Sequence, residues 1–128
     1  MSDLIVVPSS LDYADAVERL ISAVRERGLA VLARVDHAAG ARAAGLELAD
    51  EEVVWFGNPA AGTPLMQSDP RVGIELPLHV LIWEDADGTR LAYRDPRELL
   101  HAYDLAEREG TLTKMNELLA ELAAVAAG

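Results

Sequence analysis

Apolar and polar residues alternate along several short stretches of this chain and recur at helical spacing along two longer ones. Strand-like apolar runs occupy residues 4–7, 29–35, 52–57, 78–84 and 89–94. Residues 11–27 and 111–126 place apolar side chains three and four positions apart, which predicts two amphipathic helices. Shorter helices are expected over 38–45, from Pro59 to about Met66, after Asp69-Pro70, and from Arg97 to about Tyr103. The last three follow an Asn or Asp joined to a proline, a pairing typical of helix starts.

This order of elements, with two consecutive strands late in the chain, predicts an α+β fold with a largely antiparallel sheet and helices packed on one face. The fourth and fifth strands should form a hairpin, because Asp87-Gly88 supplies the positive φ that a tight turn needs. No internal repeat or composition break divides residues 1–128, so we expect a single domain. In the second strand, alternation puts Leu29, Val31, Ala33 and Val35 on one face.

Large apolar side chains are expected on the sheet face away from the helices. They are Leu32, one alternating set from residues 53–56, Leu81 and Trp83. Such a patch favours a homodimer that covers it. The alternative is that the C-terminal helix or the loop over residues 58–77 folds across that face.

Composition excludes several classes of function. The net charge is −11 with a pI near 4.5, which disfavours nucleic acid and anionic membrane surfaces as partners. The chain has no cysteine, so disulfides and thiolate chemistry are excluded. The first residues resemble neither a signal peptide nor a membrane span, which predicts a cytoplasmic protein. The glycines are not spaced as a phosphate-binding loop, and no cofactor is expected.

Several segments together resemble the domain-of-unknown-function family numbered 302. They are VLARVDH at residues 31–37, FGNP at 56–59, GTPLMQSD at 62–69, and LP at 76–77 followed by an apolar strand. With the first helix and the hairpin, the resemblance covers about residues 10–100. It implies an α+β fold similar to a single-copy TATA-box-binding-protein-like fold, often dimeric, and assigns no catalytic role. The motif positions that carry over are His37, Gly57, Asn58, Pro59, Gly62, Thr63, Pro64, Leu65, Gln67 and Pro77.

From these positions we predict a small-ligand-binding domain with a polar pocket near His37, Asn58, Thr63 and Gln67. One alternative is a hydrolase- or isomerase-like enzyme that uses His37 as general base with Asp36 to orient it. A third possibility is an interaction protein that uses its C-terminal helix as a docking face. Each residue also has a plainer interpretation, since His37 can brace a loop and Asn58 can brace its own turn. Metal binding is not expected, because the three histidines show no ligand-type spacing. His79 is interpreted as a satisfied sheet histidine and His101 as a helix-surface residue.

Overall fold

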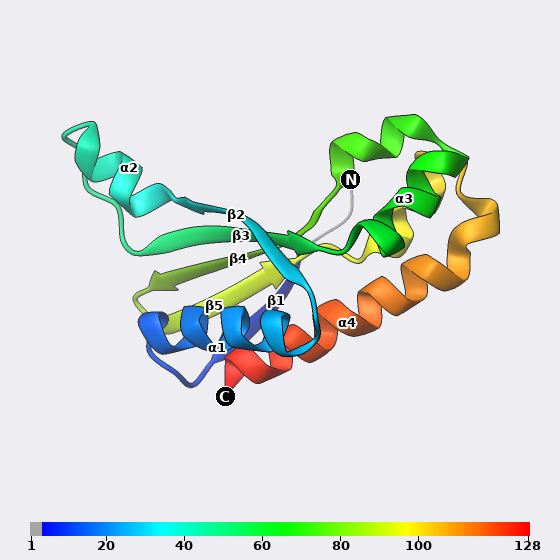
Figure 1. Ribbon diagram of the computed structural model, residues 1–128. Coiled ribbons are helices and arrows are strands. Elements are labelled where there is room, and N and C mark those ends of the chain that lie inside the picture. Colours follow the sequence, from blue (N-terminus) through cyan, green and yellow to red (C-terminus); the bar gives the residue numbers. More distant parts are fainter. Residues whose placement is uncertain (1–3) are drawn as a thin grey trace.

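The chain folds around one five-stranded sheet in which every neighbouring pair of strands is antiparallel (Figure 1). This computed structural model describes residues 4–128. The strand order is β1-β5-β4-β3-β2. The strands are β1 (Ile5–Ser9), β2 (Ala30–Asp36), β3 (Glu51–Gly57), β4 (Leu78–Asp85) and β5 (Gly88–Tyr93). The predicted α+β class with an antiparallel sheet is therefore confirmed.

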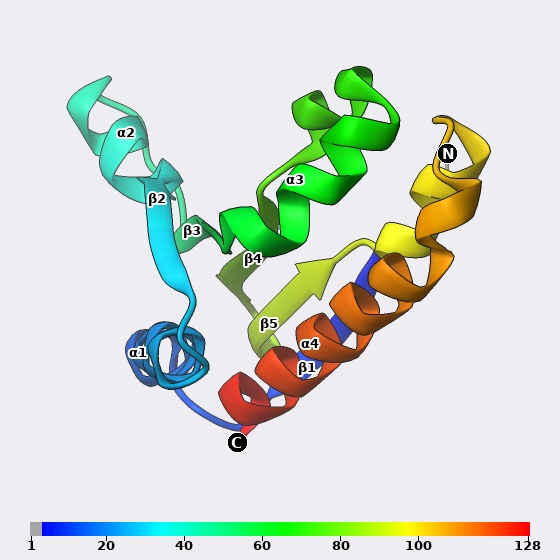
Figure 2. The ribbon, with the colours of Figure 1, turned by 45° about the vertical axis from the view of Figure 1, so that its right-hand side comes forward.

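Two amphipathic helices, α1 (Tyr13–Glu26) and α4 (Glu109–Ala127), pack together against one face of the sheet. In Figure 2, α1 is seen nearly end-on at the lower left, and α4 runs diagonally from beside it towards the upper right, across β1. The core between helices and sheet includes Leu20, Val54, Phe56, Ile82 and Leu122, each at most 1% exposed. Burying several such side chains contributes about 1.5–3 kcal/mol each, which holds this face together.

Polar groups cap the start of α1 and the end of α4. The Asp12 carboxylate accepts the N–H of Asp15 at the start of α1. At the other end of the chain, Ser9 Oγ donates to the carbonyl of Ala126, and the N–H of Ser10 donates to that of Ala127. The β1–α1 connection therefore satisfies carbonyl groups that the last turn of α4 leaves without helical partners.

The predicted hairpin is confirmed by the pairing of β4 with β5. Glu84 lies opposite Thr89 and Asp85 opposite Gly88, so Ala86 and Asp87 make the turn. Gly88 has φ +119°, the backbone region that only glycine enters without strain. The Asp85 carboxylate also accepts the N–H of Asp87 within the turn.

Shorter helices extend the helical layer beyond one end of the sheet. They are α3 (Pro59–Ser68), η1 (Pro70–Glu75), η2 (Pro96–His101) and η3 (Ala106–Arg108). The three predicted proline starts are confirmed, although the segments after Asp69 and Asp95 form 3₁₀ turns. A second buried cluster joins these turns to the first half of α4 and consists of Leu65, Val72, Leu105, Leu112 and Met115.

The regular alternation predicted for β2 is wrong beyond Val31. Val31 lies opposite Phe56, but Ala33 lies opposite Trp55, so Leu32 is an extra, unpaired residue in a β-bulge. The bulge shifts the pleat by one residue, which moves Ala33 and Val35 to the face opposite the helices. Arg34 then faces α1 and binds the buried carboxylate of Glu52, with Nη2 3.1 Å from Oε1.

The sheet face away from α1 and α4 is called the open face here. It carries Val53, Trp55, Leu81 and Trp83, none of which belongs to either buried cluster. Trp55 stacks obliquely on His79, with ring centroids 5.5 Å apart. The two segments weighed as possible covers pack elsewhere, because α4 lies against the other face and α3 packs in the second cluster.

The outer strand β1 runs one residue past its proline, although the apolar run was expected to close at Pro8. Pro8 lies opposite Arg90, inside the ladder with β5. An outer strand accepts a proline where the missing N–H would face away from the neighbouring strand. The strand therefore continues to Ser9, whose side chain reaches α4.

Candidate functional site

The structure separates the four residues that were predicted to share one pocket. In the antiparallel β2–β3 pair, Ala30 lies opposite Gly57 and Asp36 opposite Glu52. His37, which follows Asp36, and Asn58, which follows Gly57, therefore lie at opposite ends of a ladder about 20 Å long. In Figure 1, the helices that begin at these two residues, α2 (His37–Ala43) and α3, lie at opposite ends of the molecule. The prediction that one pocket contains both His37 and Asn58 is therefore wrong.

Asn58 and Thr63 do line one cavity, called the motif cavity here. It has a volume of about 280 Å³ and lies between α3, α4 and the adjoining ends of β2, β3 and β4. Six motif positions line it: Gly57, Asn58, Pro59, Gly62, Thr63 and Pro77. Gln67 is exposed on α3 and is not among the lining residues. Its predicted role in ligand binding stays a prediction without support from this geometry.

Local sequence explains how α3 comes to cover the cavity. The Asn58 side chain caps the helix by accepting the N–H of Ala60 at 2.9 Å, and Pro59 occupies the first turn. A Cβ at Gly57 would contact Pro77 at 3.6 Å, and one at Gly62 would contact Leu76 at the same distance. The strand end and the helix therefore pack against residues 76–77, at distances that are ordinary van der Waals contacts.

The walls of the motif cavity are apolar and come from segments far apart in sequence. Phe56 forms part of the wall from β3, and Met115 and Leu118 form part of it from α4. The bulged Leu32 and Met66 are 57% and 38% exposed and also line the cavity. The bulge therefore re-aims one apolar side chain of β2 towards this cavity, a recurring use of bulges beside binding sites.

A buried carboxylate fixes the turn that follows α3. Asp69 is 4% exposed and accepts the N–H groups of Arg71 and Asp104, each at 3.0 Å, as well as the Arg71 guanidinium. These bonds, chiefly that from the Arg71 side chain, hold the pKa of Asp69 well below its usual range. Arg71 also lies over the Tyr103 ring, 5.6 Å from its centroid. The network ties α3 and η1 to the segment before α4.

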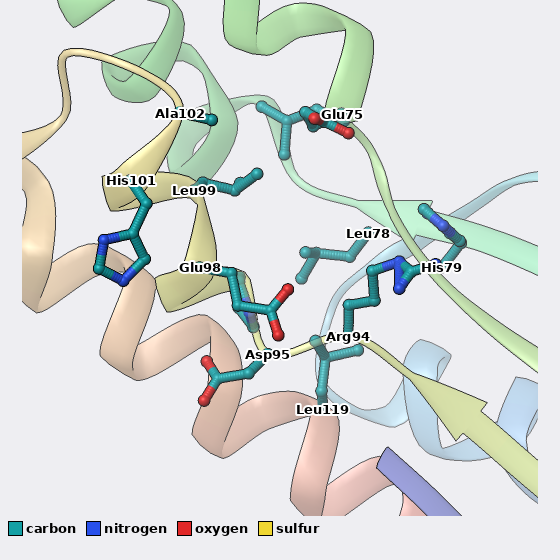
Figure 3. Close-up of a pocket in the computed structure, with 12 residues that line it drawn as sticks. Glu75, Leu78, His79, Arg94, Asp95, Glu98, Leu99, His101, Ala102 and Leu119 are labelled. Carbon is teal, nitrogen blue, oxygen red and sulfur yellow. The ribbon is translucent and has the colours of Figure 1, made fainter. Parts of the chain in front are cut away.

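A second and larger cavity, called the polar cleft here, has a volume of about 650 Å³ (Figure 3). His79 from β4 and Arg94, which directly follows β5, lie on one side of it, and Glu98 and His101 from η2 lie on the other. Leu76 and Leu78 line both cavities, so the two are neighbours. The sequence interpretation missed this cleft, because its polar groups come from separate strands and turns and form no local motif.

The chemistry available in the polar cleft is limited by how its polar groups are already used. Asp95 caps η2 by accepting the N–H of Arg97, and its carboxylate also receives the Arg97 guanidinium. His79 is exposed, contrary to its interpretation as a covered sheet histidine, and its Nδ1 lies 3.2 Å from the carbonyl oxygen of Pro77. Among residues 4–128, no three His, Asp or Glu side chains are grouped so as to hold a metal ion.

His37 lies at the end of β2 away from the motif cavity, and its surroundings do not support the predicted role as a general base. The Asp36 carboxylate accepts the N–H of Ala39 at 2.9 Å and thereby caps α2. It is therefore engaged in helix capping instead of orienting the neighbouring imidazole. His37 itself is exposed.

These features define a small α+β domain with an antiparallel sheet and an apolar cavity built by its motif segments. The chain belongs to the family described as domain of unknown function DUF302, which matches residues 5–127. A crystal structure of an uncharacterized conserved DUF302 protein from Bacillus stearothermophilus has the same fold, with a TM-score of 0.86 at 17% identity. The similarity covers 96% of this chain and 97% of that one.

Two curated relatives are each 41% identical to this chain over 105 residues, which is 81% of its length. They are the proteins named fluoride-specific ion channel FluC 1 of Brucella suis biovar 1 (strain 1330) and of Brucella abortus biovar 1 (strain 9-941). The matched region makes up only 41% and 39% of those proteins. Within residues 4–128, no helix is both long enough and apolar enough to cross a membrane.

Proposed function

We propose that this chain is a small-ligand-binding domain and that the motif cavity is its binding site. The observation that carries the proposal is the convergence of six motif positions from three separate sequence segments on that one cavity. Capping and close packing account for some of these residues individually. Their shared position around an apolar space supports a binding role in addition.

The polar cleft is the larger space, but the motif cavity has the properties of a ligand site. Its wall is mostly hydrocarbon, and Asn58 and Thr63 supply a few polar groups at defined positions. Small-molecule sites combine these two features, because apolar walls provide affinity and a few polar groups fix orientation. The polar cleft instead mixes acidic and basic side chains, and Asp95 there is already paired with Arg97.

A pair of substitutions on α3 tests this function. Ala61 lines the cavity and Ala60 beside it does not, although both are exposed. Ala61→Phe should fill part of the cavity, whereas Ala60→Phe adds the same side chain outside it. Wild-type protein and both variants would be screened against a metabolite library by thermal shift. We expect compounds that stabilise the wild type and Ala60→Phe but not Ala61→Phe.

The proposal fails if compounds stabilise all three proteins equally, or if none stabilises the wild type. In the first case the ligand binds elsewhere, and the polar cleft becomes the site to examine. Circular dichroism of the two variants provides the folding control. Both should retain the wild-type spectrum.

We also propose that the chain forms a homodimer through the open face. Trp55, Leu81 and Trp83 are only half-buried there, and Val6 and Val35 are 50% and 41% exposed. Covering several such side chains at about 25 cal/mol per Å² favours association before its entropy cost is counted. Sedimentation at micromolar concentration should give about twice the chain mass of 13.8 kDa. A particle of monomer mass would contradict the dimer.

Trp83→Glu places a charge on the open face and should yield a folded monomer. Ala86→Glu, in the exposed hairpin turn, adds the same charge away from the strands and should remain dimeric. If Trp83→Glu unfolds the protein, the indole belongs to the core of the monomer. If both variants stay dimeric, the interface lies elsewhere.

A second candidate function is an accessory role beside a fluoride-specific ion channel. It is favoured by the 41% identity to the matched part of proteins that carry that name. We propose that the chain acts in the cytoplasm; its lack of cysteine suits a reducing compartment. Deleting its gene should lower the fluoride concentration that stops growth, and the wild-type gene should restore it. Unchanged fluoride sensitivity would remove this candidate.

A further inference from the structure

The chemistry of the motif cavity narrows the class of ligand that it can hold, on the basis of the binding function proposed above. Among the residues that line it, only Asn58 and Thr63 have polar side chains, and none has a titratable one. The cavity is open to solvent where Asn58 and Thr63 are exposed, so a charged group held against its wall, without a partner of opposite charge, loses part of its hydration energy. The net charge of −11 opposes anions further.

A helix N-terminus beside a cavity often receives an anion, but α3 has no free N–H groups to offer. Pro59 has no N–H, and the N–H of Ala60 donates to the Asn58 side chain. The N–H groups of Ala61 and Gly62 both donate to the Asn58 carbonyl, at 2.9 and 3.2 Å. The whole first turn is therefore satisfied within the chain, and a carboxylate or phosphate would find no donor there.

Asn58 does retain hydrogen-bonding groups that a ligand can use. Its Oδ1 accepts the N–H of Ala60, which fixes the orientation of the amide and leaves the Nδ2 group as a donor for other partners. Asn58 lines the cavity. A ligand oxygen with a lone pair, in a hydroxyl, ether, ester or amide, can therefore be bound without a charge.

The volume of the motif cavity and the side chains in its wall limit the hydrocarbon part of the ligand. At about 30 Å³ for a water-sized group, 280 Å³ holds roughly ten non-hydrogen atoms. Met66 and Met115, two of the chain's three methionines, lie in the wall. Methionine side chains are flexible and polarisable, so the wall adapts to chains of different shape.

We propose that the motif cavity binds an uncharged, largely hydrocarbon molecule of roughly ten non-hydrogen atoms that presents one oxygen acceptor to Asn58. A medium-chain alcohol, ester or amide has these properties. A fatty-acid anion, a phosphorylated metabolite or an amine does not.

Three probes of nearly equal size and different charge test the ligand class: 1-octanol, octanoate and octylammonium. Binding would be followed by NMR of ¹³C-methyl methionine, with the Met66 signal assigned from Met66→Leu. We expect octanol to shift the Met66 and Met115 signals saturably at neutral pH. The two ions should bind at least tenfold more weakly.

Asn58→Asp tests the anchor, because aspartate keeps the helix cap while it removes the amide donor and adds a negative charge. This variant should bind octanol several-fold more weakly and should now prefer octylammonium. Asn58→Ser, which also caps a helix, should weaken octanol binding without that change of preference. Unchanged octanol affinity in both variants would overturn the role of Asn58.

Two results separate failure of the ligand class from failure of the binding function. If octanoate or octylammonium binds as tightly as octanol, the uncharged class is wrong, but the cavity remains a binding site. If no probe shifts Met66 or Met115, the class is also wrong, and the thermal-shift screen decides whether the binding function survives. If dilution without any probe shifts both signals even in Trp83→Glu, which should lack the open-face dimer, the occupant is a second copy of the chain, and the small-molecule proposal is overturned.

Discussion

The two ends of the β2–β3 pair differ sharply, although at each of them a strand passes into a helix capped by its preceding Asp or Asn. At the Asn58 end, α3 packs through Leu65 into a buried cluster and covers a cavity. At the His37 end, Ala38 is the only buried residue of α2, and Leu46 and Leu48 beyond it are 66% and 46% exposed. The same local capping chemistry therefore leads to a packed site in one place and an exposed turn in the other.

The difference arises from what each helix meets after it starts. Helix α3 encounters η1, η3 and α4, which come from later in the chain and complete its surroundings. Helix α2 contacts mainly β3. Nearby, Arg34 of β2 forms an ion pair with Glu52 of β3. The capping residue sets where a helix begins, and contacts with distant segments determine whether that helix covers a cavity.

The largest expected effect comes from the same substitution made at both ends. Leu65→Ala removes a fully buried side chain and should lower the free energy of unfolding by about 2–5 kcal/mol. Leu46→Ala removes an exposed side chain and should change it by no more than about 0.5 kcal/mol. Urea denaturation of both variants measures the contrast. Similar losses would mean that residues 44–50 are packed in solution.

A smaller loss is expected at the His37 end when the ion pair is broken. Arg34→Leu leaves the Glu52 carboxylate, whose side chain is 6% exposed, without its donor. An unsatisfied buried acceptor costs about 1–3 kcal/mol, which urea denaturation would detect. Adding Glu52→Leu to this variant should restore part of the stability. A double variant less stable than Arg34→Leu alone would contradict this explanation.

At the Asn58 end, the expected electrostatic effect is concentrated at acid pH. Because its folded-state pKa is lowered, Asp69 contributes stability that is complete above the ordinary aspartate pKa near 4 and is lost as pH falls below it. Asp69→Asn keeps one oxygen acceptor but replaces the other with an amide that cannot accept, so it should be less stable than the wild type near neutral pH. Its free energy of unfolding should fall less than that of the wild type between about pH 5 and pH 2. If the free energy of unfolding fell equally in both proteins over this pH range, the role assigned to Arg71 would be contradicted.

The smallest effect is expected from uncapping the exposed helix. Asp36→Ala removes the acceptor for the N–H of Ala39 and should lower the free energy of unfolding by about 0.5–1 kcal/mol, which urea denaturation would measure.

His37→Ala should leave octanol binding in the motif cavity unchanged, because His37 and the cavity lie at opposite ends of the β2–β3 ladder. A change in octanol affinity in His37→Ala would mean that the two ends are coupled.

Local signals in the sequence were sufficient for the elements and the hairpin. Asp and Asn before proline mark three starts, and Asp87-Gly88 marks the turn between β4 and β5. They could not reveal how strands pair, because strand order and direction depend on contacts distant in sequence. The pocket predicted around His37 therefore failed, while Asn58 and Thr63 remained on one cavity.

The cavity walls were the least accessible to sequence reasoning. Met115 and Leu118 belong to α4, where the helical apolar spacing is the same whether a side chain fills the core or lines a space. The bulge at Leu32 has no proline or glycine to mark it. Both features follow from the fit of distant segments, which a pattern along one strand or helix does not encode.

Pro8 and the Leu32 bulge lie on the two outermost strands of the sheet, β1 and β2. An outermost strand with an unbroken row of N–H and C=O groups is a template on which further strands can assemble into fibrils. Pro8 removes one donor from that row on β1, and the bulge distorts the row on β2. Within residues 4–128, neither border of the sheet is a regular template, so the fold carries protection against amyloid-like growth in its strand geometry.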